Sequence, residues 1–125
     1  MIRLPNFESA VIPLEKLRDY ALNEDHLTGK HKARVFRSAL GIHRTHASVL
    51  SELIRATLAN APAQQGAAGE HGEAWTTWHE VAGLNAQSAI VTVAWIFKKD
   101  TERTPELVTC YIDVKAQQEL RKLFV

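Results

Sequence analysis

The sequence of 125 residues contains one cysteine and has no long hydrophobic run. A lone cysteine, Cys110, excludes an intramolecular disulfide framework and a cysteine-rich zinc site, and it fits a reducing compartment such as the cytoplasm. No segment approaches 18 consecutive apolar residues, and the first residues lack the apolar core of a signal peptide. We therefore expect neither a membrane span nor a signal peptide.

An excess of charge of one sign is also missing, since 15 Lys and Arg residues face 14 Asp and Glu residues and leave a net charge of +1. Any contact with nucleic acid must therefore come from a local basic patch. The sequence contains no Walker loop, no dinucleotide fingerprint and no nucleophile elbow, which removes most common enzyme classes. The histidines form no His-Glu-x-x-His pattern, so we expect no metal and no cofactor.

The composition that is present, 46% hydrophobic and 23% charged, is typical of one globular domain over residues 1–125. The first part, about 1–60, has the 3.6-residue periodicity of helices. We predict helices over 13–23, over 28–40 with Thr28 as N-cap and Gly41 as the left-handed C-cap, and over 46–60. The Ala-, Gln- and Gly-rich segment 61–72 is predicted to be a flexible loop.

From residue 73 to residue 113 the period changes from 3.6 to 2, which is typical of strands. We predict strands over 74–81, 88–97 and 106–113, a polar turn over 98–105, and a helical tail over 114–125. In the last strand Val108, Cys110 and Ile112 should face the core, with Leu107, Thr109 and Tyr111 on the opposite face. The predicted fold class is α+β, with N-terminal helices packed on a small antiparallel β-sheet and a C-terminal helical tail.

The segment from His26 to Phe36 gathers two imidazoles, two ammonium groups and a guanidinium around a glycine at the start of a helix. Such groups suit a site that binds phosphate and moves protons near neutral pH. On a helix, Lys30, Arg34 and Arg37 share one flank, whereas Lys32 lies on the other edge of the apolar stripe.

Several separated segments resemble an uncharacterised bacterial domain family, and together they span residues 4 to about 112. They are Leu4-Pro5-Asn6, Ala10-Val11-Ile12-Pro13 with Lys16-Leu17-Arg18-Asp19-Tyr20, then His26, Gly29, Lys32-Ala33 and Phe36, then Leu40-Gly41-Ile42, Thr92, Trp95-Ile96 and Pro105 to Tyr111. That family looks like the barnase, EndoU, colicin and RelE type ribonuclease toxins. The resemblance implies a metal-independent endoribonuclease of a toxin-antitoxin or toxin-immunity pair, acting in the cytoplasm of its own cell or of a target cell.

The resemblance implies a catalytic site at His26, Lys32, Thr109 and Tyr111. Gly29, Lys30, His31, Arg34 and Arg37 would bind RNA phosphates, with the amides of Gly29 and Lys30 offering an anion site at the start of the helix. Cleavage of RNA needs a base for the 2′-hydroxyl, an acid for the leaving oxygen and a cation for the phosphorane. Sequence spacing does not assign acid and base. The family pattern has proline where this chain has Leu27 and Ile112.

Each of these residues also has a structural interpretation. His26 and His31 could be surface residues, the basic flank could be a solvated helix face, and Thr109 and Tyr111 could line the wetter face of a sheet. Trp75, Trp78 and Trp95 could stack on bases, but strand aromatics are more often core, which we expect for Trp95.

Two functional alternatives to the ribonuclease follow. The first is a non-enzymatic binding module, whose sheet face and tail helix would contact a protein partner. The second, an enzyme that transfers a nucleotide-derived group, would need a cosubstrate pocket that the sequence does not indicate. The partners we expect are a cognate antitoxin or immunity protein and RNA, with no membrane contact. The sequence leaves homo-oligomerisation open.

Overall fold

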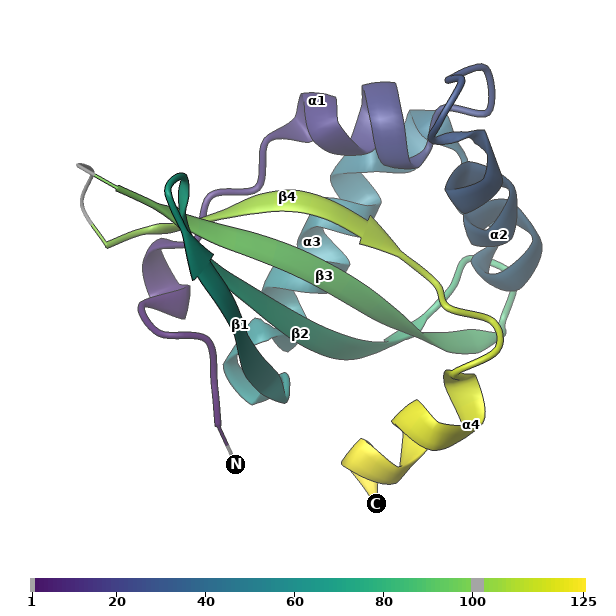
Figure 1. The fold of residues 1–125 in the computed structure, drawn as a ribbon. Coiled ribbons are helices and arrows are strands. Elements are labelled where there is room, and N and C mark those ends of the chain that lie inside the picture. Colours follow the sequence, from purple (N-terminus) through teal and green to yellow (C-terminus); the bar gives the residue numbers. More distant parts are fainter. Residues whose placement is uncertain (1, 100–102) are drawn as a thin grey trace.

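The computed structural model describes residues 2–99 and 103–125, and it contains a four-stranded antiparallel sheet with helices on one face. The strands follow one another in the sheet as they do in the sequence (Figure 1). They are β1 (Ala63–Gly69), β2 (Gly72–Ala82), β3 (Ser88–Lys98) and β4 (Pro105–Tyr111). The predicted α+β fold is confirmed.

Three helical regions precede the sheet, near the predicted positions. The first is a short α-helix, α1 (Leu14–Lys16), that continues as a π-helical turn, η2 (Leu17–Ala21). The others are α2 (Lys30–Leu40) and α3 (Ala47–Thr57). Short 3-10 turns η1 (Phe7–Ser9), η3 (Arg44–His46) and η4 (Leu58–Asn60) link them. Figure 1 shows α3 crossing behind the sheet and α2 beside the end of β4. In the described part of the chain, no helix is long and apolar enough to cross a membrane.

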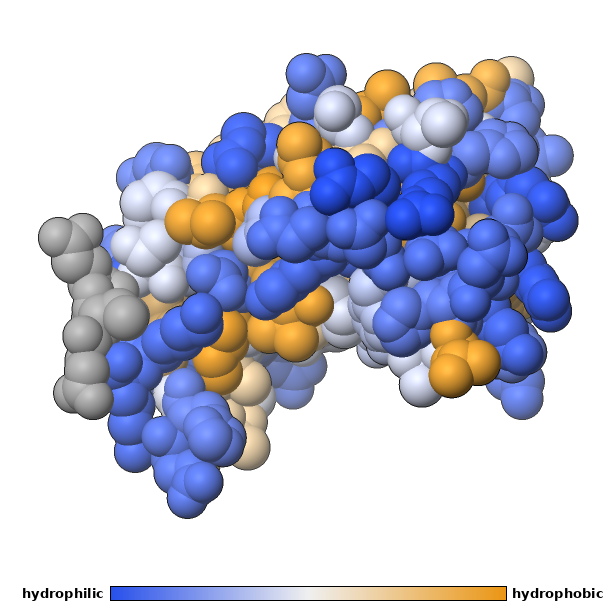
Figure 2. All heavy atoms as spheres, turned by 90° about the horizontal axis from the view of Figure 1, so that it is seen from above, coloured by the Kyte–Doolittle hydropathy of each residue, from blue (hydrophilic) through white to orange (hydrophobic). Residues whose placement is uncertain are grey.

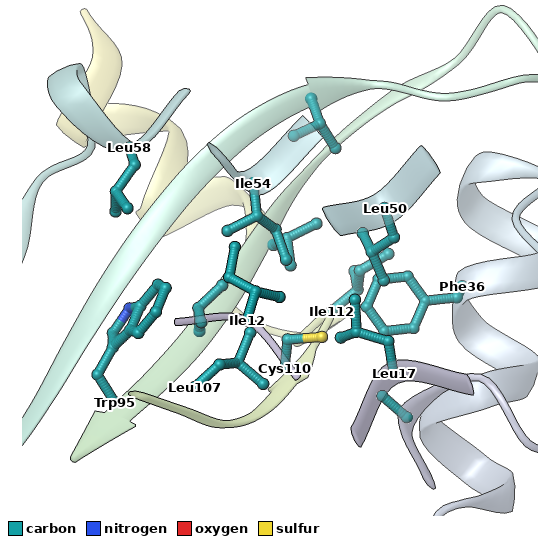
Figure 3. Close-up of a cluster of buried hydrophobic side chains, with 14 of the residues drawn as sticks. Ile12, Leu17, Phe36, Leu50, Ile54, Leu58, Trp95, Leu107, Cys110 and Ile112 are labelled. Atoms are coloured by element: carbon teal, nitrogen blue, oxygen red, sulfur yellow. The ribbon is translucent and has the colours of Figure 1, made fainter. Parts of the chain in front are cut away.

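The core lies between the helices and one face of the sheet. Alternate residues of β3, from Val91 to Phe97, are buried in the same hydrophobic cluster as Phe36 of α2 and Leu50 of α3. Figure 3 shows Trp95, Phe36 and Leu50 in this cluster. Trp95 is 1% exposed, so its prediction as a core residue is confirmed. Burial of such large side chains is the main favourable term in folding, worth about 1.5–3 kcal/mol for each of them.

The segment predicted as a flexible loop, 61–72, is instead mostly strand β1. Its residues pair with β2 in a register that runs from Ala63 opposite Thr77 to Gly69 opposite Gly72, with an irregularity after Gln65. Gly and Ala have low strand propensity, but β2 offers a free edge to which a neighbouring segment can bond. The prediction was wrong because backbone pairing with β2 outweighs the side-chain preferences of β1.

The last strand contains a β-bulge that changes which residues face the core. Ala94 is opposite Thr109 but Trp95 is opposite Leu107, so Val108 has no partner of its own. Leu107 and Cys110 are therefore fully buried and Val108 is 44% exposed, so the predicted inward position of Val108 and the predicted outward position of Leu107 were both wrong. A bulge shifts the alternation by one residue, and nothing in the sequence marks it. Part of the predicted polar turn 98–105, residues 100–102, lies outside the described residues.

The predicted tail helix is present as α4 (Gln117–Leu120) and the 3-10 turn η5 (Arg121–Phe124). Its attachment is polar: the carboxamide of Gln117 accepts a bond from the Ile90 amide (2.9 Å) and donates one to the Ile90 carbonyl (3.0 Å). The pairing of β3 with β4 ends at Thr92 and does not reach Ile90. Gln117 therefore supplies the hydrogen-bond partners that a longer β4 would have given to the backbone of Ile90.

We predict that Gln117→Ala lowers the free energy of unfolding by about 1–2 kcal/mol, because it leaves a buried backbone amide and carbonyl unpaired. Urea titration followed by tryptophan fluorescence measures this change. Gln118→Ala, at the exposed neighbouring position, is the control and should leave stability unchanged. Equal stability of the two variants would show that Gln117 does not hold the tail.

Candidate functional site

Three elements that are far apart in the sequence meet around the amine of Lys32. The side chain extends from α2 and donates hydrogen bonds to Tyr20 Oη of η2 and to Thr109 Oγ1 of β4, both at 3.3 Å. The amine also lies 4.9 Å from the ring centre of Tyr20 and 5.4 Å from that of Tyr111. Three of the four predicted catalytic residues are thus in direct contact.

The positive charge of Lys32 is half-buried and is not neutralised by an acid. No carboxylate within residues 2–99 and 103–125 forms an ion pair with it. Its partners are two hydroxyl oxygens and two aromatic faces, which stabilise an ammonium group without cancelling its charge. Two of its three N–H bonds are directed at the hydroxyls, and no hydrogen bond among the described residues uses the third.

Tyr20 is the site residue that the sequence analysis missed. Its hydroxyl contacts Lys32, and its ring packs edge-on against the ring of His26 with centroids 4.8 Å apart. Tyr20 lies in the π-helical turn, where the Leu22 amide bonds to the Leu17 carbonyl five residues back. Such turns are common at functional sites. The sequence feature that could have identified Tyr20 is its position at the end of a segment that carries the family resemblance.

Polar contacts hold η2 in place beside the site. Asp19, next to Tyr20, accepts hydrogen bonds from Arg18 (3.0 Å) and from Arg44 of η3 (3.0 Å), and these lower the pKa of its carboxyl to about 2. Lys16 joins α1 to β4 by donating to Glu106 Oε2 (3.2 Å) and to the Leu107 carbonyl (3.1 Å). Asp19 therefore fixes η2 to η3, and Lys16 fixes the preceding helix α1 to β4, the strand that supplies Thr109.

His26 joins this cluster through Tyr20 and also shapes the loop before α2. Its Nδ1 atom accepts hydrogen bonds from the amides of Thr28 (3.1 Å) and Gly29 (3.0 Å). The side chain of Thr28 contacts the same Nδ1 atom (3.1 Å) and does not cap the helix, which begins at Lys30. The predicted N-cap role of Thr28 is therefore wrong. The predicted C-cap is confirmed, since Gly41 has φ 66°.

The proposed anion site at the amides of Gly29 and Lys30 is not available. The Gly29 amide is bonded to His26 Nδ1, and the Lys30 amide donates to the His26 carbonyl at 3.0 Å. Gly29 is required for another reason, because a β-carbon there would overlap with the carbonyl oxygen of Tyr20. Its missing side chain lets the His26 loop lie directly on η2.

We predict that Gly29→Ala destabilises the protein by about 1–3 kcal/mol and disturbs the contacts of Tyr20, since the added methyl group must displace backbone. The measurement is the urea midpoint, with the NMR signals of Tyr20 and His26 as local reporters. Gly69→Ala is the matched control, because a β-carbon there meets nothing within 4 Å. Wild-type stability of Gly29→Ala would contradict the close packing of loop and turn.

The other predicted phosphate-binding residues do not join the cluster. Lys30, Arg34 and Arg37 lie across the buried stripe of α2 from Lys32, as helical geometry requires, and His31 is exposed. Arg37 forms an ion pair with Glu24 (3.2 Å) on the surface. Figure 2 shows the molecule from above, the side on which α1 lies in Figure 1, and there most of the surface is hydrophilic, with smaller groups of apolar residues between.

Cys110 and one of the histidines, His79, lie inside the protein. Cys110 is fully buried, and burial raises the pKa of its thiol to about 12, although the nearby charge of Lys32 acts in the opposite direction. It is a core residue, as predicted (Figure 3). His79 is also fully buried, and burial lowers the pKa of its imidazole to about 4. Across the described ranges, no three His, Cys, Asp or Glu side chains form a group that could hold a metal ion.

Comparison with known proteins places the chain among related folds. A chain of the contact-dependent growth inhibition toxin-immunity protein complex from Klebsiella pneumoniae 342 has the same fold, with a TM-score of 0.61 over 86% of this chain and 96% of that chain. The two sequences are 15% identical, so the likeness is one of fold. No functionally curated protein matches the sequence. Residues 3–114 match a family described as a domain of unknown function, DUF6883, and the chain therefore belongs to the DUF6883 family.

Proposed function

We propose that this protein is the toxin of a toxin-immunity or toxin-antitoxin pair and that it cleaves RNA without a metal ion. The observation that carries the proposal is the half-buried Lys32 ammonium, which has no described acidic partner and is surrounded by Tyr20, Thr109 and Tyr111. An uncompensated cation beside several hydroxyl groups is suited to bind a phosphodiester. The likeness of fold to a chain of a toxin-immunity complex supports a role in such a pair, whereas the proposed cleavage of RNA rests on the Lys32 cluster.

The chemistry follows from what a phosphodiester requires. The 2′-oxygen attacks the adjacent phosphorus, the bond from phosphorus to the 5′-oxygen breaks, and the products are a 2′,3′-cyclic phosphate and a 5′-hydroxyl end. The 2′-hydroxyl gives up a proton and the leaving 5′-oxygen takes one. Lys32 would stabilise the extra negative charge of the phosphorane, and Thr109 would hold a phosphate oxygen.

Expression of the protein in bacterial cells, from a tightly controlled promoter, tests the proposal. We expect growth arrest with degradation of cellular RNA, relieved when the reading frame next to this gene in its own genome is expressed as well. Arrest without loss of RNA would contradict the ribonuclease and leave a toxin with another target.

The alternative is a non-enzymatic partner of the immunity type, because the complex that shares this fold contains an immunity protein as well as a toxin. The same experiment separates the two. An immunity-type protein leaves growth unchanged when it is expressed alone and protects cells against the product of a neighbouring toxin gene.

A further inference from the structure

His26 is held in one orientation by bonds to the backbone. Nδ1 faces the amide protons of Thr28 and Gly29 at 3.1 and 3.0 Å, and the Thr28 hydroxyl at 3.1 Å. A backbone amide can only donate, so Nδ1 must be the acceptor in both bonds. The single proton of the neutral imidazole then belongs to Nε2, because the hydrogen bonds of one ring nitrogen decide the tautomer of the other.

We propose that His26 serves the site as a hydrogen-bond donor through Nε2 and that it is not the general base of RNA cleavage. A base at Nε2 would need the proton on Nδ1, where it would face two other protons and break both amide bonds. Removal of those bonds would release the loop that leads into α2. This inference rests on the proposed ribonuclease for its role in catalysis, but the tautomer itself can be measured without activity.

The other polar groups of the cluster can also act as hydrogen-bond donors. Lys32 has an N–H bond that no described residue uses, and since Tyr20 and Thr109 accept bonds from Lys32, their own hydroxyl protons point away from it. With His26, four groups would offer protons to a phosphate, a pattern suited to binding anionic oxygens. Tyr111 is the other titratable side chain of the cluster, and its hydroxyl forms no hydrogen bond among the described residues. It is the remaining candidate for the base.

Two substitutions test the roles of the two ring nitrogens of His26 separately. His26→Asn places an amide oxygen where Nδ1 lies and can accept the same two amides, as Asn does at helix starts, but it has no group at Nε2. His26→Gln places its NH₂ group near Nε2 but cannot cap the loop in the same way. We expect His26→Asn to keep the urea midpoint of the wild type and to lose RNA cleavage by about 100- to 1,000-fold, the usual effect of removing one donor aimed at a transition state. We expect His26→Gln to unfold at lower urea and to retain more cleavage than His26→Asn.

Long-range ¹H–¹⁵N NMR of the uniformly ¹⁵N-labelled protein at about pH 8 measures the tautomer directly, with the His26→Asn spectrum used to assign the signals. The proposal predicts the pattern of a neutral imidazole protonated at Nε2. A ring protonated at Nδ1 would overturn it whether or not the protein cleaves RNA. Full cleavage by a stable His26→Asn would instead leave His26 with a loop-capping role alone and overturn the donor role. If the wild type cuts no RNA, the proposed function fails and the NMR result still decides the tautomer.

Discussion

Replacing Lys32 by alanine is expected to lower the rate of RNA cleavage by about 100- to 1,000-fold, the usual effect of removing one charged or hydrogen-bonding group aimed at a transition state. The loss should be large because no described acid accompanies Lys32, so its charge remains available to the phosphate. The measurement is the rate constant for cutting a defined RNA under single-turnover conditions, together with the urea midpoint.

The matched control for this prediction is Lys30→Ala. It removes the same group from the same helix, but on the flank that faces away from Tyr20 and Thr109. It should change the rate by no more than about threefold, as expected for a partly exposed charge outside the cluster that contributes mainly to association. Lys32→Arg keeps the charge but not the compact amine, and should recover only part of the rate. Equal rates for Lys30→Ala and Lys32→Ala would place the catalytic centre elsewhere.

Acidification from about pH 7.5 to about pH 5 is expected to lower the free energy of unfolding by about 2 kcal/mol through one residue, His79. This imidazole is fully buried and lies between two hydroxyl groups, Thr57 Oγ1 at 2.7 Å from Nδ1 and Thr77 Oγ1 at 2.7 Å from Nε2. Trp95 donates to Thr77 Oγ1 (2.8 Å), and Thr57 donates to the Leu53 carbonyl (2.8 Å).

One arrangement of protons satisfies this whole chain of hydrogen bonds. Trp95 donates to Thr77, Thr77 donates to His79 Nε2, His79 Nδ1 donates to Thr57, and Thr57 donates to the Leu53 carbonyl. In this arrangement Nε2 accepts, so the imidazole is neutral. A second proton would meet the Thr77 hydroxyl proton and would add a charge to the core, which is costly.

The sign of the pH effect follows from the two pKa values of His79. Burial lowers the pKa in the folded state to about 4 from an ordinary value of 6.5, so between these values the unfolded chain binds the proton and the folded chain does not. Stability is therefore fully present above pH 6.5 and falls as the pH decreases toward 4, in total by about 3 kcal/mol. Measurements at pH 5 and above avoid the carboxylates such as Asp19, whose pKa is about 2.

Urea unfolding at several pH values checks this prediction, with His79→Gln and His43→Gln compared with the wild type. His79→Gln should be less stable at neutral pH but should lose most of the pH dependence. His43 is exposed, and its replacement should leave the pH dependence unchanged. A wild-type pH dependence in His79→Gln would assign the effect to another group.

The helices and the three longer strands could be predicted because their side chains alternate with the period of their backbone. The stripe of Ala33, Phe36 and Leu40 in α2 and the alternation from Val91 to Phe97 in β3 both face the core. β1 could not be predicted, since its Ala, Gln and Gly residues carry no such pattern and its place depends on the edge of β2. The bulge at Val108 could not be predicted either, because it depends on the pairing of β4 with β3 and no residue pattern indicates it.

The candidate site was predicted in part, because the family resemblance selected His26, Lys32, Thr109 and Tyr111 without information on distance. The contact of Lys32 with Thr109, 77 residues apart, exists only because α2 packs beside the end of β4. Tyr20 was missed since a tyrosine on an amphipathic helix resembles an ordinary boundary residue, and only the π-helical turn brings its hydroxyl to Lys32. The flank of Lys30, Arg34 and Arg37 looked equally basic in the sequence but belongs to another surface.

The most direct test of the central claim is to incubate the purified protein with total RNA in excess chelator and to determine the ends of the products, beside Lys32→Ala and Lys30→Ala checked for folding. We predict fragments that end in 2′,3′-cyclic phosphate and 5′-hydroxyl, formed by the wild type and Lys30→Ala and almost lost with Lys32→Ala. Intact RNA in the presence of the well-folded wild type, or identical cutting by Lys32→Ala, would contradict the claim that the Lys32 cluster cleaves RNA.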